Sequence, residues 1–95
     1  MKDYQLVDNE EEKQYEFHID DYLAKIEYIK TKDDAIYLTH TEVPRALGGQ
    51  GIATQLVEKV FKDIENKDLK LVPLCPFVIG YLNKNPEWGR LVKRG

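Results

Sequence analysis

The chain has 95 residues, of which 42% are hydrophobic and 33% are charged, and its formal net charge is -3. This length suits one small domain, and the acidic balance argues against general nucleic-acid binders and anionic-membrane binders, which need clustered Lys and Arg. The one cysteine, Cys75, excludes an internal disulfide and leaves too few thiols for a zinc site.

We therefore expect a single domain over residues 1–95, with no metal site and no nucleic-acid or membrane partner. Residues 1–13 contain no apolar segment of the kind found in signal peptides. No apolar run approaches the roughly 20 residues that a membrane-spanning helix needs. A cytoplasmic protein, monomeric or weakly dimeric, is the expectation.

The first half of the chain predicts an antiparallel β-meander. Residues 14–19 alternate between apolar and polar side chains, and residues 22–30 continue that alternation. Residues 35–43 are rich in the Ile, Tyr, Thr and Val that fit a pleated surface. Short Asp-containing turns separate these three strands. We expect residues 3–7 to add an edge strand and the acidic run 8–12 to form a surface turn.

The second half predicts a helix, a strand and a second helix. Six apolar residues form one stripe of a helix that begins at Ile52: Ile52, Leu56, Val57, Val60, Phe61 and Ile64. Residues 69–74 predict a buried strand, parallel to 35–43 because a helix connects the two. Pro73 must end or distort that strand. A short helix is expected from Pro76, with Phe77, Val78, Tyr81 and Leu82 inward, and then a turn over 86–92. The predicted class is α+β, an antiparallel β-meander followed by α-β-α with a parallel strand pair.

The segment LGGQGIATQLV, residues 47–57, concentrates three glycines immediately before the predicted main helix. A helix N-terminus has unpaired N–H groups and a partial positive charge, and glycines let a phosphate approach them closely. Residues 47–53 offer no Ser, Thr, Asp or Asn to cap the helix from within. The spacing matches neither a Walker loop nor a dinucleotide-binding fingerprint. Two interpretations remain open: a tight packing turn, or a phosphate site.

The pattern V-P-x-x-L-G-G-Q-G-I-A, residues 43–53, resembles motif A of the GNAT N-acetyltransferase superfamily. Gly51 and Ala53 occupy defined positions of that motif, whereas Gly48 stands where Gln or Arg is usual. With T-H-T-E-V-P at 39–44, P-L-C-P-F at 73–77 and Y-L-N-K-N-P-E-W at 81–88, the chain resembles the minimal GNAT-like proteins, the YjdJ-like subfamily, over about residues 14–92. The resemblance implies a truncated GNAT (acyl-CoA N-acyltransferase-like) fold.

The resemblance implies acetyl-coenzyme A, or coenzyme A, as the cofactor. Its pyrophosphate would sit on backbone N–H groups of the loop, and its pantetheine arm would pair with the strand backbone where strands 35–43 and 69–74 splay apart. The implied cofactor-binding residues are Glu42, Val43, Gly48, Gly49, Gln50, Gly51, Ile52, Ala53, Pro76 and Phe77. Candidates for the adenosine 3′-phosphate are Arg45, Lys59, Lys62 and Lys84.

Acyl transfer from a thioester to an amine needs a deprotonated amine and a stabilised leaving thiolate. His40 and Glu42 are two apart on one strand, so their side chains share a face just before the loop. Either side chain could take a proton from the acceptor amine. His40 is better suited to this, because an imidazole ordinarily titrates near neutral pH. The other interpretation is structural: His40 fits a hydrogen-bonded residue of a half-buried strand equally well, and Glu42 fits a solvated or structural strand residue better.

Two further residues are catalytic candidates. Cys75 would be a nucleophile if the helix beginning at Pro76 or the base His40 favours its thiolate; otherwise it is a small buried apolar residue. Tyr81 resembles the tyrosine that often protonates the leaving thiol in GNAT enzymes, although a core tyrosine fits the pattern equally well.

The chain is much shorter than a typical GNAT domain, which implies an open acceptor site. The implied function is an N-acetyltransferase acting on an unidentified amine: a protein lysine, a polyamine or a small molecule. The alternatives are a coenzyme A-binding module without catalysis and an interaction protein that has lost the cofactor.

Overall fold

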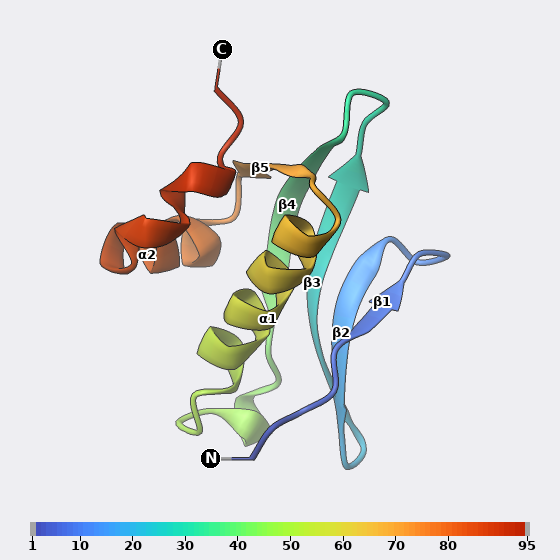
Figure 1. The fold of residues 1–95 in the computed structure, drawn as a ribbon. Coiled ribbons are helices and arrows are strands. Elements are labelled where there is room, and N and C mark those ends of the chain that lie inside the picture. Colours follow the sequence, from blue (N-terminus) through green and yellow to red (C-terminus); the bar gives the residue numbers. More distant parts are fainter. Residues whose placement is uncertain (1, 95) are drawn as a thin grey trace.

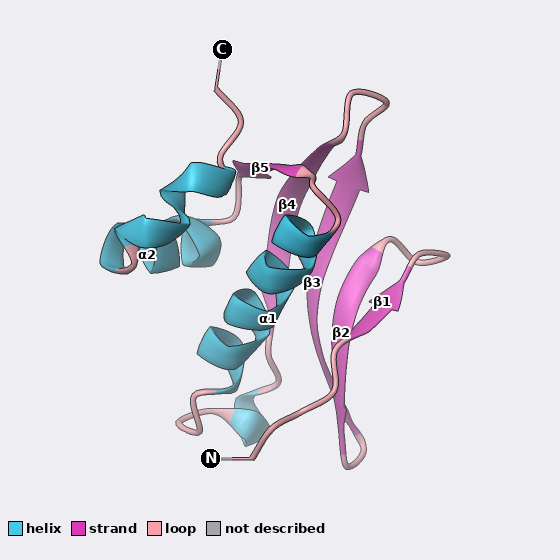
Figure 2. Ribbon diagram, viewed as in Figure 1, coloured by secondary structure: helices cyan, strands magenta, loops and turns pink. Residues whose placement is uncertain are grey.

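A five-stranded mixed sheet, with strand order β1-β2-β3-β4-β5, carries the fold in the computed structural model, which describes residues 2–94. The long helix α1 lies across one face of this sheet, and α2 packs beside α1 (Figures 1 and 2). The elements are β1 (Val7–Asn9), β2 (Gln14–Ile19), β3 (Tyr22–Lys30), β4 (Ala35–Glu42), η1 (Arg45–Leu47), α1 (Ile52–Asn66), β5 (Lys70–Pro73), α2 (Pro76–Lys84) and η2 (Pro86–Leu91).

The predicted topology is confirmed. Strands β1 to β4 pair antiparallel in sequence order, and β5 pairs parallel to β4 after the α1 crossover. No helix within residues 2–94 has the length and apolarity to cross a bilayer. The edge strand differs from the prediction: it begins at Val7 and includes Asp8, so the turn contains only residues 10–13. Asp8 pairs with Tyr15 of β2, and its Oδ1 also accepts a hydrogen bond from Tyr28 Oη at 2.6 Å.

The core lies between the sheet and α1. All six residues of the predicted α1 stripe are buried. They pack against the alternate residues of β2 and β3 that point to the same side, namely Tyr15, Phe17, Ala24, Ile26 and Tyr28. Burying such side chains contributes about 1.5–3 kcal/mol each, so this interface holds the helix on the sheet.

Helix α2 packs on α1 through aromatic rings. The ring of Phe61 lies 5.6 Å from that of Tyr81 and 5.7 Å from that of Trp88, both edge-on. Tyr81 and Val78 are buried, whereas Phe77 is 41% exposed, so the prediction that Phe77 points inward is wrong. Val78 and Tyr81 are three residues apart and form the buried stripe of a short helix, and Phe77 lies off that stripe.

A β-bulge changes which side chains of β4 face α1. In the register with β3, Leu38 lies opposite Tyr28 and His40 lies opposite Glu27, so Thr39 is an extra residue. Before the bulge, Leu38 points toward the core, and after it Thr41, opposite the fully buried Ile26, does so. His40 and Glu42 therefore point to the face away from α1.

The two parallel strands separate at this bulge. Their ladder ends at the pair Leu38 and Pro73, and no strand among residues 2–94 pairs with the β5 side of Thr39–Glu42. The N–H groups of Leu74 and Cys75 both donate to the carbonyl of Leu38, at 3.1 and 3.0 Å, as the chain turns away. The predicted splay is present, and the backbone of β4 beyond Leu38 is an open edge.

A partly exposed polar cluster joins β1 to the end of α1. Lys67 Nζ lies 2.8 Å from Asp8 Oδ2 and 2.8 Å from Asp63 Oδ2, and Tyr15 Oη donates to that Asp63 oxygen at 2.8 Å. Burial would raise the pKa of Asp8, but its hydrogen bonds with Lys67 and Tyr28 outweigh this and keep the pKa below its ordinary value.

We expect Lys67→Met to lower the free energy of unfolding by about 1 kcal/mol at pH 7, a modest value because Lys67 is partly exposed. A carboxyl with a lowered folded pKa stabilises the fold above its unfolded pKa and loses that effect as the pH falls through the folded pKa. The parent should therefore lose more stability than the variant between pH 7 and about pH 3. Urea titrations at both pH values measure this, with Lys32→Met, in an exposed turn, as the control. Equal acid losses in parent and Lys67→Met would contradict it.

Candidate functional site

The glycine loop leads into α1 through two residues with left-handed backbone. Gly49 has φ of 76° and Gly51 has φ of 70°, a conformation that other residues adopt only with strain. Gly51 is the N-cap of α1, and no side chain of the described residues caps this helix. The first bond within the helix runs from Gln55 N–H to the Gly51 carbonyl, at 3.0 Å. The preceding N–H groups are thus available to an external acceptor.

Three hollows border the start of α1, and two of them, which share lining residues, together form what we call the interhelix groove. The first, of about 290 Å³, is lined by Val43, Pro44, Arg45, Leu47, Gly48, Gly49, Gly51, Ile52, Ala53, Thr54 and Phe77. The second, of about 270 Å³, is lined by Thr54, Pro76, Phe77, Gly80, Tyr81 and Lys84. Thr54 and Phe77 belong to both hollows. Most of the cofactor-binding residues expected from the sequence therefore line this groove, whereas Gln50 and Glu42 are exposed and line neither hollow.

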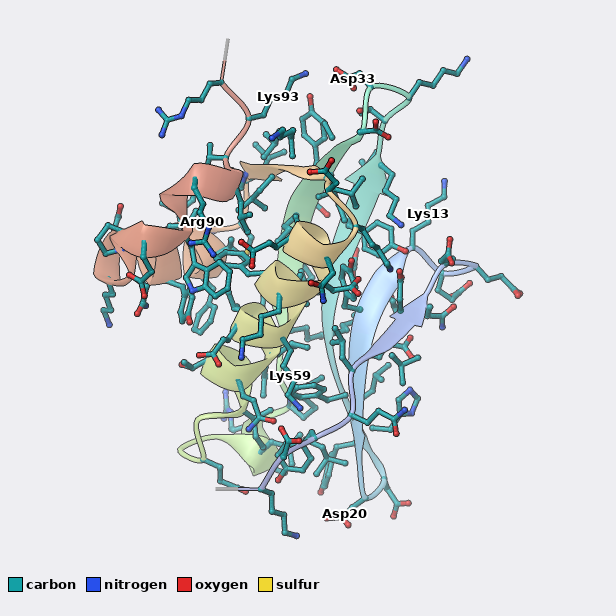
Figure 3. The ribbon with its side chains drawn as sticks, in the orientation of Figure 1. Lys13, Asp20, Asp33, Lys59, Arg90 and Lys93 are labelled. Carbon is teal, nitrogen blue, oxygen red and sulfur yellow. The ribbon has the colours of Figure 1, made fainter. Side chains whose placement is uncertain are left out.

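The structure separates the four basic candidates for a phosphate. Arg45 and Lys84 line the interhelix groove. Lys59 instead reaches the N-terminal segment, where its Nζ lies 2.6 Å from Asp3 Oδ1 and donates to the Tyr4 carbonyl (Figure 3). Lys62 Nζ lies 3.3 Å from Glu58 Oε1. Arg45 and Lys84 are thus the two cations placed to meet a ligand in the groove.

Cys75 is the N-cap of α2 and lies at the point where β4 and β5 separate. Its thiol donates to Thr41 Oγ1 at 3.1 Å, and the residue is only 5% exposed. Burial would raise the pKa of the thiol, but the Thr41 hydroxyl and the backbone N–H groups of Val78, Phe77 and Thr41 outweigh it, so the pKa lies below its ordinary value. The Thr41 hydroxyl makes the largest lowering contribution, and the N–H groups of Phe77 and Val78 add the contribution expected from a helix that begins at Pro76.

Tyr81 lines the groove from α2. Its Oη lies 3.4 Å from Glu58 Oε2 on α1. Burial and the charge of Glu58 raise the pKa of Tyr81 above its ordinary value, so the phenol remains protonated at neutral pH. A protonated phenol at the groove can donate to an anion that forms there.

His40 and Glu42 are exposed on the opposite side of the sheet from Cys75 and α1. Glu42 Oε1 lies 3.7 Å from Lys25 Nζ. The structure therefore places His40 and Cys75 on the two sides of β4, and the side chain that accepts the hydrogen bond of the thiol is Thr41.

Thr41 and Glu58 were not among the residues selected from the sequence. Only the bulge at Thr39 turns Thr41 toward Cys75, and a bulge has no reliable local signal. Glu58 lies one helical turn after Thr54 on α1, a spacing that places both on one side of the helix. That spacing, together with the glycine loop, was a usable indication that Glu58 lies near the start of α1, where it lines a separate hollow with Gly51 and Thr54 and contacts Tyr81.

Comparison with known proteins agrees with the sequence motifs. Residues 14–91 match the family model for GCN5-related N-acetyl-transferase. Protein NATD1 of Xenopus tropicalis is 37% identical over 60 residues, which are 63% of this chain and 53% of that protein. Human Protein NATD1 is 39% identical over 49 residues, 52% of this chain and 43% of that protein. The chain thus spans about half the length of the curated relatives it matches.

The fold also matches a solved structure. The solution structure of a Staphylococcus aureus protein described as GCN5-like superposes with a TM-score of 0.72 and 25% sequence identity. The match covers 98% of this chain and 91% of that one. Because the family model covers most of the chain, from β2 through η2, the chain belongs to the GCN5-related N-acetyltransferase family.

Proposed function

We propose that this protein binds acetyl-coenzyme A and transfers the acetyl group to an amine. The observation that carries the proposal is the continuity of three features: an uncapped α1 N-terminus, the interhelix groove and the open backbone edge of β4. Members of the family generally use acetyl-coenzyme A. The residues present suit its three chemical parts, which are a pyrophosphate, an extended amide arm and a thioester.

The glycine loop is suited to the pyrophosphate. Backbone N–H groups at the start of α1 meet the two requirements of such an anion, hydrogen bonds and positive potential. Gly49 and Gly51 expose this backbone, since no side chain beyond Cα shields it. Arg45 and Lys84, at the two ends of the groove, are available for the 3′-phosphate. The exposed ring of Phe77 offers an apolar surface between them.

The open edge of β4 is suited to the amide arm. Peptide groups from Thr39 to Glu42 lack a strand partner on the β5 side in the described chain, so an extended ligand can pair with them as an added strand does. An arm that follows this edge from the loop ends near the bulge, beside Cys75. The thioester would therefore lie at the splay.

We assign the two proton transfers that the reaction needs to His40, on β4, and Tyr81, in the interhelix groove. His40 takes the proton from the acceptor amine, directly or through water, as the amine nitrogen bonds to the acetyl carbon. Tyr81 donates its proton to the thiolate that leaves when the carbon–sulfur bond breaks. The products are the acetylated amine and coenzyme A, and bulk water restores both side chains.

A second route is favoured by the lowered pKa of Cys75. The Cys75 thiolate would bond to the acetyl carbon and displace the coenzyme A thiolate, and the amine would then displace Cys75. The buried position of the sulfur argues against ready access by a large acceptor. Direct transfer is therefore the first proposal, and acetyl-Cys75 is the alternative.

Isothermal calorimetry with acetyl-coenzyme A and coenzyme A tests the proposed binding. We expect saturable heat and a raised melting temperature for both ligands. Absence of both effects at millimolar ligand would exclude the transferase and also a non-catalytic coenzyme A-binding module. Binding without thioester consumption across a panel of amines would favour the non-catalytic module.

Intact-mass spectrometry distinguishes the two routes. The protein is exposed to acetyl-coenzyme A without an amine. If transfer is direct, the parent should show no acetyl adduct on Cys75. Turnover of Cys75→Ala should then stay within about threefold of the parent, since a buried Cys→Ala change alters packing only modestly. The control is Cys75→Ser, which keeps a hydrogen bond to Thr41. An adduct that is absent in Cys75→Ala and disappears on adding an amine would establish the cysteine route instead.

A further inference from the structure

Segment 2–6 runs along α1, from beside the first turn of the helix to β1 (Figure 1). Two hydrogen bonds to one side chain hold it there. The Tyr4 N–H donates to Gln55 Oε1 at 2.9 Å, and Gln55 Nε2 donates to the Lys2 carbonyl at 2.8 Å. Segment 2–6 belongs to no strand or helix, so the Gln55 amide does for its backbone what a neighbouring strand would do.

Two further contacts fasten the segment farther along α1. Lys59 Nζ lies 2.6 Å from Asp3 Oδ1 and donates to the Tyr4 carbonyl. The ring of Tyr4 packs against the ring of Phe17 on β2, with 5.6 Å between the ring centroids. The segment is therefore anchored at Tyr4, and Lys2 extends from that anchor toward the start of α1.

The third hollow at the start of α1 joins this segment to the glycine loop. It has a volume of about 440 Å³ and is lined by Lys2, Gly51, Thr54, Gln55 and Glu58. Gly51 and Thr54 also line the interhelix groove, so the two spaces meet at the first turn of α1. A ligand held on the glycine loop therefore lies within reach of a side chain from segment 2–6.

Lys2 brings a positive charge to a place that is already positive. The first turn of α1 has no acidic residue and no side-chain cap, so nothing within it offsets the positive end of the helix dipole. The acids beside Lys2 are engaged elsewhere, because Asp3 pairs with Lys59 and Glu58 pairs with Lys62 at 3.3 Å. A cation is unfavourable beside a helix N-terminus, and an anion bound between them removes that repulsion.

Resting on the proposed binding of acetyl-coenzyme A, we infer that segment 2–6 is a clasp that closes over the cofactor pyrophosphate. Gln55 holds the backbone of the segment on α1, and the Lys2 ammonium reaches across the hollow to a phosphate oxygen on the glycine loop. Gln55 is thus a positioning residue, and Lys2 is a cofactor-binding residue. Bound cofactor in turn holds the segment on α1, because linked equilibria favour one another reciprocally.

A double-mutant cycle on coenzyme A binding, measured by calorimetry, tests this inference. We expect Lys2→Met to weaken binding about three- to fivefold, the scale of one exposed charge pair, and the effect should shrink at 0.5 M salt. Gln55→Ala, which releases the segment and keeps a good helix former, should weaken binding by a similar factor. Lys2→Met should then have no further effect in the Gln55→Ala background. The control is Lys32→Met, the same charge change in an exposed turn.

Truncated cofactors identify the phosphate that Lys2 contacts. Dephospho-coenzyme A keeps the pyrophosphate and lacks the 3′-phosphate, so Lys2→Met should weaken its binding by the same factor. Pantetheine has no phosphate, so the parent and Lys2→Met should bind it equally. If the effect of Lys2→Met disappears with dephospho-coenzyme A, Lys2 contacts the 3′-phosphate and the pyrophosphate assignment is wrong.

Amide hydrogen exchange measures closure of the clasp directly. Because the Tyr4 N–H donates to Gln55, its exchange should slow at least about fivefold when coenzyme A saturates the parent, and by less in Lys2→Met. If coenzyme A binds, Tyr4 exchange does not change and Lys2→Met behaves like Lys32→Met, only this inference fails. If the parent does not bind coenzyme A, the proposed function fails and the clasp with it. Melting temperatures, measured first, establish that each variant is folded.

Discussion

Replacing Gly51 by aspartate is expected to weaken acetyl-coenzyme A binding by more than about 100-fold, because hydrogen bonds to charged groups contribute about 1.5–3 kcal/mol each. Gly51 is the N-cap of α1, so the new carboxylate would lie against the N–H groups proposed to hold the pyrophosphate. It would repel the phosphates and offer those N–H groups an internal acceptor. Calorimetry at matched ionic strength measures the change.

The fold should survive this substitution. Gly51 is exposed, and although its φ of 70° strains most residues, aspartate tolerates the left-handed region better than most. The matched control is Gly89→Asp, which adds the same charge in η2 where a new Cβ meets no atom within 4 Å. Unchanged affinity in a folded Gly51→Asp protein would assign the loop to packing alone, the other interpretation of its three glycines.

Tyr81→Phe is expected to lower kcat about 100-fold, the lower end of what a general acid contributes, while the Kd for acetyl-coenzyme A stays within about twofold. The variant keeps the ring that packs against Phe61, so neither the groove nor the contact between α1 and α2 should change. It loses only the phenolic hydroxyl, which the raised pKa of Tyr81 keeps protonated at neutral pH.

A change of leaving group separates an acid role from a structural one. A more acidic thiol leaves more readily as the thiolate, so its acetyl thioester depends less on protonation of the leaving group. If Tyr81 is the acid, the loss of kcat in Tyr81→Phe should therefore be smaller with such a thioester. Tyr22→Phe, at the exposed end of β3, is the control for loss of a phenol. A kcat equal to that of the parent, with either donor, would leave Tyr81 as a core residue.

Much of the fold was predictable because its signals are local. The alternation in residues 14–19 and 22–30 predicts β2 and β3 with the observed bounds, since side chains of a strand point alternately to two faces. The six apolar residues of α1 predict its buried side, because their helical spacing places them on one side of the helix. Pro76 marks the first residue of α2, where a missing N–H costs nothing. The family motifs around the glycine loop then predicted the family.

The arrangement of the candidate site depended on contacts between distant segments. Alternation alone cannot reveal that Thr39 is an extra residue, because the bulge exists only in the pairing of β4 with β3. That one residue sends His40 and Glu42 to the face of the sheet away from α1 and turns Thr41 toward Cys75. Likewise, Phe77 lines the groove rather than the core because α2 docks on α1 through Val78 and Tyr81.

The sequence by itself thus determined the elements, their order and the glycine loop that resembles a phosphate site, because each depends on residues close together in the chain. The tertiary structure alone decided which face each β4 side chain takes, which of the four cations border the groove, and what surrounds the Cys75 thiol. The physical reason is that strand register and helix docking are set by the packing of the whole core, and one inserted residue reverses the faces of every position after it.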